Sequence, residues 1–304
     1  MMTPDETTSY PSIELLSVDG WKDYELLDSG NGEKLERFGS YIFVRPEHQA
    51  IWQPALPEKV WEKAHARFVA TGEESGGHWD FRLAIPASWL LTYKGLSFLA
   101  RPSNSRHIGF FPEQAVHWDW IGKQVRNAGS GVSVLNLFGY TGLATLAAAK
   151  AGASVTHVDA SKKTISQARE NQQLSSLDGA SIRWIVDDAL KFVRREARRG
   201  AQYQGIILDP PKFGRGPKGE VWEFFDMLPP LLEELRPLIR NHPLFLAITA
   251  YAIRASSLTL YYALQEMMKE IPGQISTGEL VAKETSAHRQ ISLAIFSRWL
   301  AAGI

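Results

Sequence analysis

The chain has 304 residues, 44% of them hydrophobic, and its 33 Lys and Arg residues balance its 33 Asp and Glu residues. This length and composition predict one elaborated domain or two domains with a sizeable core, and the balanced charge does not by itself indicate nucleic-acid binding. The chain has no cysteine, which excludes disulfides, thiolate metal sites and thiol nucleophiles.

Targeting, membrane and metal signals are also missing from the sequence. Residues 1–10 are polar and acidic and lack the apolar core of a signal peptide. No apolar stretch reaches the ~18 residues of a membrane-spanning helix. The eight histidines are scattered without the spacing of metal ligands. We therefore expect a cytoplasmic protein with no membrane partner and no metal site.

Residues 1–105 are expected to form a smaller β-rich domain. Short strand patterns bounded by turn residues are found at 24–28, 34–38, 41–45, 79–85, 89–93 and 96–101. Most of the ten tryptophans lie in the first 120 residues. We interpret them as the core of this domain; the alternative is a surface that stacks on bases or grips a substrate.

Residues 106–304 are expected to form a second, α/β domain, entered through a helix at 113–125. Strands are predicted at 132–137, 155–158, 182–186, 205–208 and 244–249, alternating with helices at 141–151, 161–174, 189–199, 228–239 and 258–269. A possible hairpin, 279–283 with 291–299, closes the domain. Such alternation predicts a mostly parallel sheet covered by helices on both faces.

Four polar signals each follow a predicted strand, at residues 136–142, at Asp159, at 187–189 and at 209–213. The carboxyl ends of parallel strands meet at one edge of a sheet, which is where α/β proteins bind ligands. The four signals together therefore predict a pocket shaped for a nucleotide.

The first three signals each have a plausible chemistry and a simpler alternative. Gly139 and Gly142 allow a tight turn at a helix N-terminus, which suits a carboxylate or phosphate, although many α/β proteins turn this way. Asp159 is placed to accept from both ribose hydroxyls, or simply to cap the next helix. Asp188 is placed to accept from an adenine amino group, to cap its helix, or to do both.

The fourth signal, Asp209-Pro210-Pro211, is the most specific of the four. Two prolines directly after an apolar strand cannot continue a ladder of hydrogen bonds, and they fix a rigid rim. A carboxylate on such a rim faces the crevice. The alternative is a loop that only ends the strand.

These motifs resemble class I S-adenosylmethionine-dependent methyltransferases over residues 105–304. The resemblance is carried by residues 109–114, 134–142, 156–161 and 208–213, and it is strongest to the bacterial group that methylates large-subunit ribosomal RNA at cytosine carbon 5 and at guanine N7. It implies a Rossmann-like fold, S-adenosylmethionine as cofactor and S-adenosylhomocysteine as product. The first 100 residues match this group far less clearly.

The resemblance also implies which residues form the site. The methionine part of the cofactor would lie at the glycine turn, the ribose at Asp159 and the adenine at Asp188, with Asp209-Pro210-Pro211 between the methyl group and the acceptor. The expected cofactor-binding residues are Gln114, Asn136, Phe138, Gly139, Tyr140, Thr141, Gly142, Asp159, Ala160, Ser161, Asp187, Asp188, Ala189 and Asp209. The expected catalytic residues are Asp209, Pro210, Pro211, Lys212, Phe213 and Tyr251.

The absence of cysteine limits the chemistry. Methylation at carbon 5 of a pyrimidine needs a covalent nucleophile, which in the similar cytosine enzymes is a cysteine just after the fifth strand. Residues 249–256 contain none. We therefore expect transfer to nitrogen or oxygen, with Asp209 accepting a proton or orienting a lone pair and with Phe213 and Tyr251 stacking on a planar acceptor. Lys212 could equally be a solvated loop lysine.

An RNA base, in ribosomal RNA, is the favoured acceptor, chiefly through the resemblance. Residues 212–219 form a flexible basic loop beside the Asp-Pro-Pro site, whereas the arginines at 194–199 look like an ordinary charged surface. The alternatives are a small-molecule or protein substrate, a nicotinamide-dependent dehydrogenase, or a catalytically silent nucleotide-binding module. The sequence does not predict the oligomeric state.

Overall fold

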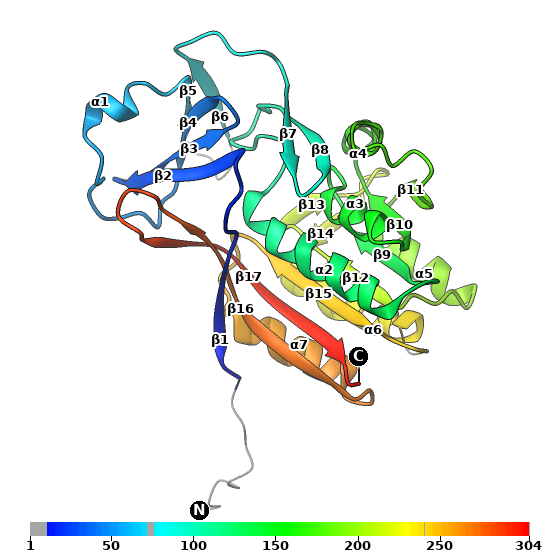
Figure 1. The fold of residues 1–304 in the computed structure, drawn as a ribbon. Helices are drawn as coiled ribbons and strands as arrows, with labels where there is room; N and C mark the ends of the chain where they lie inside the picture. The colour runs from blue at the N-terminus through cyan, green and yellow to red at the C-terminus, as the bar shows by residue number, and fades with distance from the viewer. Residues whose placement is uncertain (1–10, 72–75, 240, 304) are drawn as a thin grey trace, which may run out of the picture.

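The computed structural model describes residues 11–71, 76–239 and 241–303. The acidic segment 1–10, expected to lack a signal peptide, lies outside them. Figure 1 shows a large sheet with helices on both faces and a smaller group of strands above one end of it. No described helix has the length and apolarity needed to cross a membrane.

The large sheet has eight strands in the order β1-β16-β17-β15-β12-β9-β10-β11. Strands β15, β12, β9, β10 and β11 run parallel, whereas β17 is antiparallel to both β15 and β16. This confirms the predicted parallel α/β sheet with an antiparallel C-terminal hairpin. The strands are β1 Ile13–Ser17, β9 Ser133–Leu137, β10 Ser154–Asp159, β11 Ile182–Val186, β12 Gly205–Leu208, β15 Phe245–Ala250, β16 Gly273–Lys283 and β17 Gln290–Ala301.

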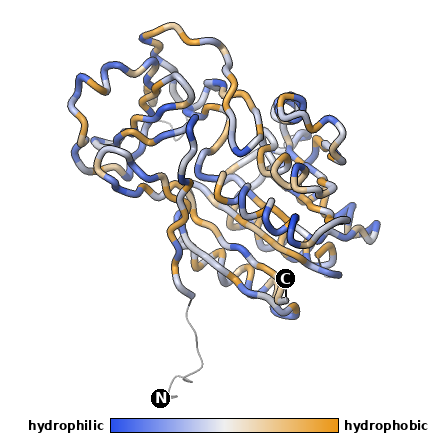
Figure 2. The backbone as a smooth tube through the Cα atoms, in the orientation of Figure 1, coloured by the Kyte–Doolittle hydropathy of each residue, from blue (hydrophilic) through white to orange (hydrophobic). Residues whose placement is uncertain are grey.

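Two layers of helices cover the sheet (Figure 1). One layer contains α5, α6 and α7, and the other contains α2 and α3 with α4 beside them. Every residue of β12 and β15 is consequently buried, and Figure 2 shows the hydrophobic segments concentrated along the central strands. The helices are α2 Ala115–Ala128, α3 Leu143–Lys150, α4 Lys162–Leu174, α5 Ala189–Arg198, α6 Phe224–Ile239 and α7 Ser257–Met268, with a short 3-10 turn, η1, at Pro112–Gln114.

The N-terminal part consists of a five-stranded sheet and a two-stranded ladder. Its aromatic side chains form a core, as predicted, because Trp21 is buried against Phe98 and against Trp118 of α2, and the buried Trp89 stacks on Phe43. This core continues into α3, so the two parts of the chain share it. The strands are β2 Tyr24–Gly30, β3 Glu33–Phe38, β4 Tyr41–Pro46, β5 Ala66–Ala70, β6 Gly77–Phe81, β7 Trp89–Tyr93 and β8 Leu96–Ala100, with a short helix α1 at Glu58–Trp61.

The first described strand leaves this N-terminal part. Strand β1 lies at the edge of the large sheet, parallel to β16. At Gly278 an added Cβ would collide with the backbone of Glu14, so glycine is required where β1 crosses closest. The first described strand therefore belongs to the large sheet and precedes the N-terminal strands, and the boundary at residue 105 stays a prediction.

The loop expected at 212–219 is a further difference. Residues Phe213–Arg215 (β13) and Val221–Glu223 (β14) pair as an antiparallel hairpin, so that only its turn at 216–220 lies outside the strands. Trp222 anchors it, since its side chain is buried and its Nε1 donates to the Pro211 carbonyl at 2.7 Å. Buried aromatic packing thus outweighs the local preference of the glycines for open conformations.

Candidate active site

A small cavity of about 50 Å³ lies at the carboxyl ends of β9, β12 and β15, under the start of α2 and of α3. Its place is the edge of the sheet that the four signals predict. The cavity is lined by Phe110, Phe111, Gln114, His117, Trp118, Asn136, Phe138, Gly139, Tyr140, Thr141, Gly142, Leu143, Ala144, Ile207, Leu208, Asp209, Ala247 and Thr249.

The glycine turn forms one wall. Phe138, Tyr140 and Gly142 all have left-handed backbone conformations, with φ of 57°, 50° and 87°. The turn is held because the Tyr140 N–H donates to Asp159 Oδ2 at 2.9 Å. A Cβ at Gly139 would collide with the buried ring of His157, so no larger residue fits there. The strained backbone persists because β10 fixes it from below.

The start of α3 opens onto the same cavity. Gly142 is its N-cap and has no side chain that could accept from its first N–H groups, while Leu143 and Ala144 line the cavity. Uncapped N–H groups and the positive end of the helix dipole suit an anion. An anion such as a carboxylate would therefore be stabilised at this wall of the cavity.

Polar side chains beneath the turn are fixed to one another. Asn136 Nδ2 donates to Thr145 Oγ1 at 2.9 Å, and that hydroxyl lies 2.9 Å from Nδ1 of His157. All three side chains are buried. Asn136 thus holds the base of the turn.

Asp209 lies on the opposite wall, directly after β12. Gln114 Nε2 donates to its Oδ2 at 3.1 Å. Burial, and then the negative charge of Glu113, raise the pKa of Asp209 to about 8, although the Gln114 hydrogen bond opposes the shift. Burial also raises the pKa of Glu113. The carboxyl group at this wall can therefore gain or lose a proton near neutral pH.

Aromatic rings close the cavity beside Asp209. The Phe111 ring lies 4.9 Å from that of Tyr251 and 5.7 Å from that of Tyr140. The Tyr251 hydroxyl is buried and has no hydrogen-bond partner among the described residues. Burial, followed by the charges of Glu113 and Asp209, raises the pKa of Tyr251 well above its usual value, so it stays a protonated donor.

The other expected cofactor residues follow β10 and β11 and do not line this cavity. Asp159 Oδ1 accepts from Ser161 N and Thr164 Oγ1, both at 2.8 Å, in addition to the bond from Tyr140. Ser161 caps α4, as predicted. Ala160 lies between Asp159 and this cap.

The residues after β11 also have internal partners. Asp188 caps α5 by accepting from Lys191 N at 2.9 Å, and Ala189 is buried behind it. Asp187 accepts from Asp188 N and pairs with Arg195. The ribose and adenine roles of these carboxylates stay predictions.

The remaining expected catalytic residues form a rim outside the cavity. Pro210 is buried, Pro211 holds Trp222, and Lys212 is exposed. Phe213 is 50% exposed, and the Arg215 guanidinium lies over its ring at 5.9 Å. An exposed aromatic ring with a cation above it is a surface on which a planar group can stack.

Two residues with hydrogen-bonding side chains in the cavity wall were not predicted from the sequence. His117 and Thr249 both line the cavity, and His117 Nε2 lies 3.4 Å from Thr249 Oγ1. His117 follows Gln114 by three residues, so on a helix the two share a face. That spacing could have identified His117, whereas nothing in the sequence connects it with Thr249.

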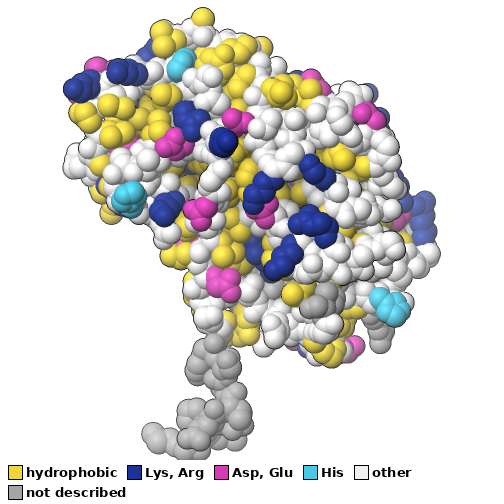
Figure 3. All heavy atoms as spheres, in the orientation of Figure 1, with side chains coloured by type: hydrophobic (Ala, Val, Ile, Leu, Met, Phe, Trp, Pro, Cys, Tyr) yellow, Lys and Arg dark blue, Asp and Glu magenta, His cyan; other side chains and the backbone are white. Residues whose placement is uncertain are grey.

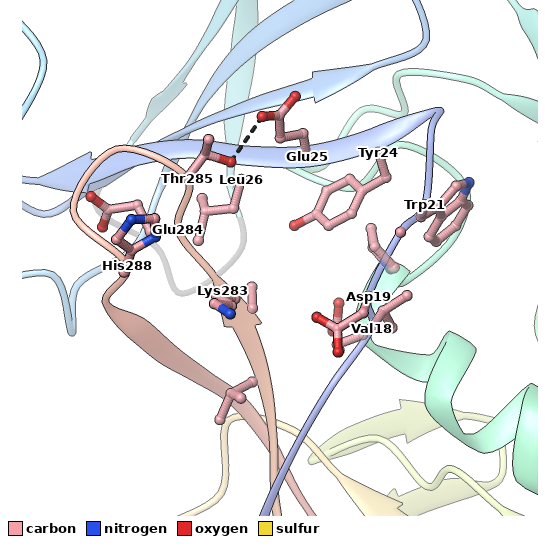
Figure 4. A pocket seen from close by; sticks show the side chains of 15 residues that line it. Val18, Asp19, Trp21, Tyr24, Glu25, Leu26, Lys283, Glu284, Thr285 and His288 are labelled. Atoms are coloured by element: carbon pink, nitrogen blue, oxygen red, sulfur yellow. Dashed lines mark hydrogen bonds between the residues drawn. The ribbon is translucent and has the colours of Figure 1, made fainter.

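A larger cavity of about 340 Å³ lies between the N-terminal sheet and the tip of the β16–β17 hairpin. Figure 4 shows Asp19, Tyr24 and Lys283 around its open space. Pro112 and Glu113 line it too, so η1 separates it from the smaller cavity. The charge of Glu113, at the wall of the larger cavity, thus acts on Asp209 at the wall of the smaller one. The described residues contain no group of three or more His, Asp or Glu that could hold a metal ion.

Known proteins are similar to this chain in sequence and in structure. A crystal structure of a SAM-dependent methyltransferase from Agrobacterium tumefaciens is 47% identical, covers 95% of both chains and superposes with a TM-score of 0.90. Ribosomal RNA large subunit methyltransferase I from Aeromonas salmonicida is 34% identical over 39% of this chain and 29% of its own length. The enzyme of the same name from Shigella boydii is 27% identical over 66% of this chain and 54% of its own. The matches thus span about half or less of these two relatives.

The sequence pattern that defines the S-adenosylmethionine-dependent methyltransferases matches residues 75–272. This range contains the glycine turn, Asp159, Asp188 and Asp209, and therefore all four of the signals at the strand ends. The chain belongs to the family of S-adenosylmethionine-dependent methyltransferases.

Proposed function

We propose that this chain transfers the methyl group of S-adenosylmethionine to a nitrogen or oxygen atom of an RNA base, with ribosomal RNA as the substrate. The observation that carries the proposal is Asp209, a carboxyl group with a pKa near 8 at the junction of the cofactor cavity and the Asp-Pro-Pro rim. A group that titrates near the working pH is suited to accept a proton from the acceptor atom.

The cofactor would be held by the glycine turn and the open start of α3, with Asp159 and Asp188 as the partners of ribose and adenine. When bound, it supplies a methyl group on an activated sulfonium. The protein then has to align the acceptor, exclude water and accept or orient one proton. Asp209 accepts or orients this proton. Pro210 and Pro211 shape the side of the site where the acceptor binds. The rings of Tyr251 and Phe213 stack on a planar acceptor. With no cysteine in 304 residues, the covalent route to carbon 5 has no nucleophile.

Charged and aromatic side chains support RNA as the acceptor. Phe213, Arg215 and Lys218 are exposed on the β13–β14 hairpin next to Asp209. Figure 3 shows further Lys and Arg side chains gathered over α2 and the β7–β8 turn, where Lys94, Lys123, Arg126 and Lys150 are exposed. Stacking together with phosphate neutralisation is the usual way that proteins hold single-stranded RNA. An enzyme with this substrate would work in the bacterial cytoplasm, where ribosomes are assembled.

The larger cavity favours a second candidate, a small-molecule or protein substrate. Its polar lining is mainly acidic, with Asp19, Glu25 and Glu113 against Lys283. An RNA backbone would be repelled there, whereas a cationic group would be attracted.

Two measurements test the proposal. Calorimetry is expected to show binding of S-adenosylhomocysteine and none of NAD. RNA from a strain lacking this gene is expected to accept labelled methyl from the purified protein and S-adenosylmethionine, and nucleoside mass spectrometry then identifies the atom. Lack of binding would refute the methyltransferase proposal, while binding without transfer to RNA would favour the second candidate.

Asp159→Ala is expected to lower the affinity for S-adenosylhomocysteine about 10-fold or more. The substitution removes the acceptor for the ribose hydroxyls and also the hydrogen bond that holds Tyr140 in the turn. Calorimetry measures the change. Thr164→Val is the control, since it removes one donor to the same carboxylate and leaves the acceptor in place. An unchanged affinity in Asp159→Ala would show that the ribose assignment is wrong.

Phe213→Ala is expected to raise KM for RNA about 10-fold and to change kcat by less than about 2-fold, because base–aromatic stacking contributes about 1–3 kcal/mol. Steady-state methylation of RNA gives both constants. Tyr262→Ala on α7, which removes a ring of the same 50% exposure elsewhere, should leave both unchanged. Equal effects of the two substitutions would count against a hairpin contact with RNA.

A further inference from the structure

Arg298 on β17 is a buried cation that pairs with no carboxylate in the part of the chain that the structure describes. Its side chain is 6% exposed, and its guanidinium lies over the rings of Trp120 and Phe296 at 4.9 and 5.0 Å. Its Nε donates to Nδ1 of His117 at 2.9 Å. Its Nη2 is buried and has no hydrogen-bond partner among the described residues.

The charge of Arg298 persists in this environment. Burial lowers its pKa to about 10, while Glu14 on β1 opposes the shift. A group with this pKa is neutral in only about one molecule in a thousand at pH 7. A buried cation is costly unless something anionic compensates it. Neither the neutral His117 nor the two rings carry a negative charge.

His117, which accepts the hydrogen bond from Arg298, lines the cofactor cavity. His117 accepts at Nδ1, so its proton lies on Nε2, and burial followed by the Arg298 charge lowers the His117 pKa well below its usual value. His117 and Thr249 both line the cavity. The cavity therefore has an imidazole N–H and a hydroxyl in its wall, with a positive charge directly behind them.

We propose that Arg298 and His117 recognise the carboxylate of the cofactor's methionine part, His117 as its hydrogen-bond donor and Arg298 as the positioning residue behind it. The inference rests on the proposed cofactor site. It accounts for the missing carboxylate partner of Arg298, since the ligand provides the negative charge, and for its hydrogen bond to His117, which fixes the tautomer that makes His117 a donor. The open start of α3 lies at the same cavity and attracts the same anion.

Calorimetry with two ligands tests the proposal. S-adenosylhomocysteine carries the amino-acid group, whereas 5′-methylthioadenosine has the same nucleoside and thioether without it. Arg298→Met is expected to lower the affinity for S-adenosylhomocysteine at least 10-fold and the affinity for 5′-methylthioadenosine less than 2-fold. Arg298→Lys is expected to give an intermediate loss of affinity for S-adenosylhomocysteine. Arg236→Met, which removes a cation from a surface ion-pair group, should change neither.

His117→Phe provides an independent variant, because it removes the donor and keeps an aromatic ring in the core. This variant is also expected to lose affinity for S-adenosylhomocysteine and to keep its affinity for 5′-methylthioadenosine. Equal weakening of both ligands, or no weakening of either, in a variant with a native circular dichroism spectrum would overturn the proposal. A wild-type protein that binds neither ligand would instead refute the proposed function, and this inference with it.

Discussion

Asp209→Asn is expected to lower the rate of methyl transfer about 10²- to 10³-fold while leaving the affinity for S-adenosylhomocysteine within about threefold. The asparagine keeps the size of the side chain, and its carbonyl can still accept from Gln114 Nε2. It cannot accept a proton. The loss should therefore fall on kcat, measured with RNA and labelled cofactor, and not on binding measured by calorimetry.

The pH dependence of the wild type gives a second, independent measurement. Because the pKa of Asp209 is raised to about 8, its carboxyl group is mostly protonated at pH 6 and mostly ionised at pH 9. If the ionised form accepts the proton, kcat/KM rises with pH, has its midpoint near pH 8 and levels off above about pH 9. Glu113→Gln removes one cause of the raised pKa, so the midpoint should move to lower pH.

The same pKa also predicts a change in stability. Asp209 binds its proton more tightly in the folded protein than in the unfolded chain, so its contribution to folding is largest at low pH and is lost as the pH rises through about 8. Asp209→Asn removes this dependence and should gain stability over the wild type as the pH rises. Asp178→Asn, an exposed carboxylate in the loop before β11, is the matched control for rate and stability. A similar loss of rate in both variants would argue against a specific role for Asp209.

Much of the large sheet could be predicted because its signals are local. The strand at 133–137 is mostly apolar and four of its five residues are buried, and the glycine turn follows directly. Ser161 caps α4 where a serine stands before the helix pattern. Each of these features depends on neighbours within a few residues, which a sequence displays directly.

The parts that could not be predicted depend on distant residues. The sequence of β1 does not indicate which sheet the strand joins, because its partner strand, β16, begins only at residue 273. His117 and Arg298 are 181 positions apart, so their hydrogen bond leaves no local pattern. The β13–β14 hairpin has flexible glycines and is ordered by Trp222. Each of these three features is determined by tertiary packing and not by the local sequence.

Arg289→Met is expected to lower the free energy of unfolding by about 3 kcal/mol, because it leaves two buried carboxylates facing each other without a cation. Arg289 lies at the tip of the β16–β17 hairpin, where Nη2 donates to Glu284 Oε1 at 2.7 Å and to Asp28 Oδ1 at 3.3 Å. Both acids have no exposed surface. Asp28 belongs to β2, so this cluster joins the large sheet to the N-terminal sheet (Figure 1).

Urea unfolding measures the loss, and Arg236→Met is the matched control. Arg236 also contacts two carboxylates, those of Glu233 and Glu266, but these are more than half exposed, so its removal should cost less than about 1 kcal/mol. Adding Glu284→Gln to Arg289→Met should restore part of the stability, because one of the two unpaired charges is then removed. No recovery in the double variant would mean that the loss comes from the contact of the Arg289 guanidinium with the Trp52 ring rather than from the buried charges.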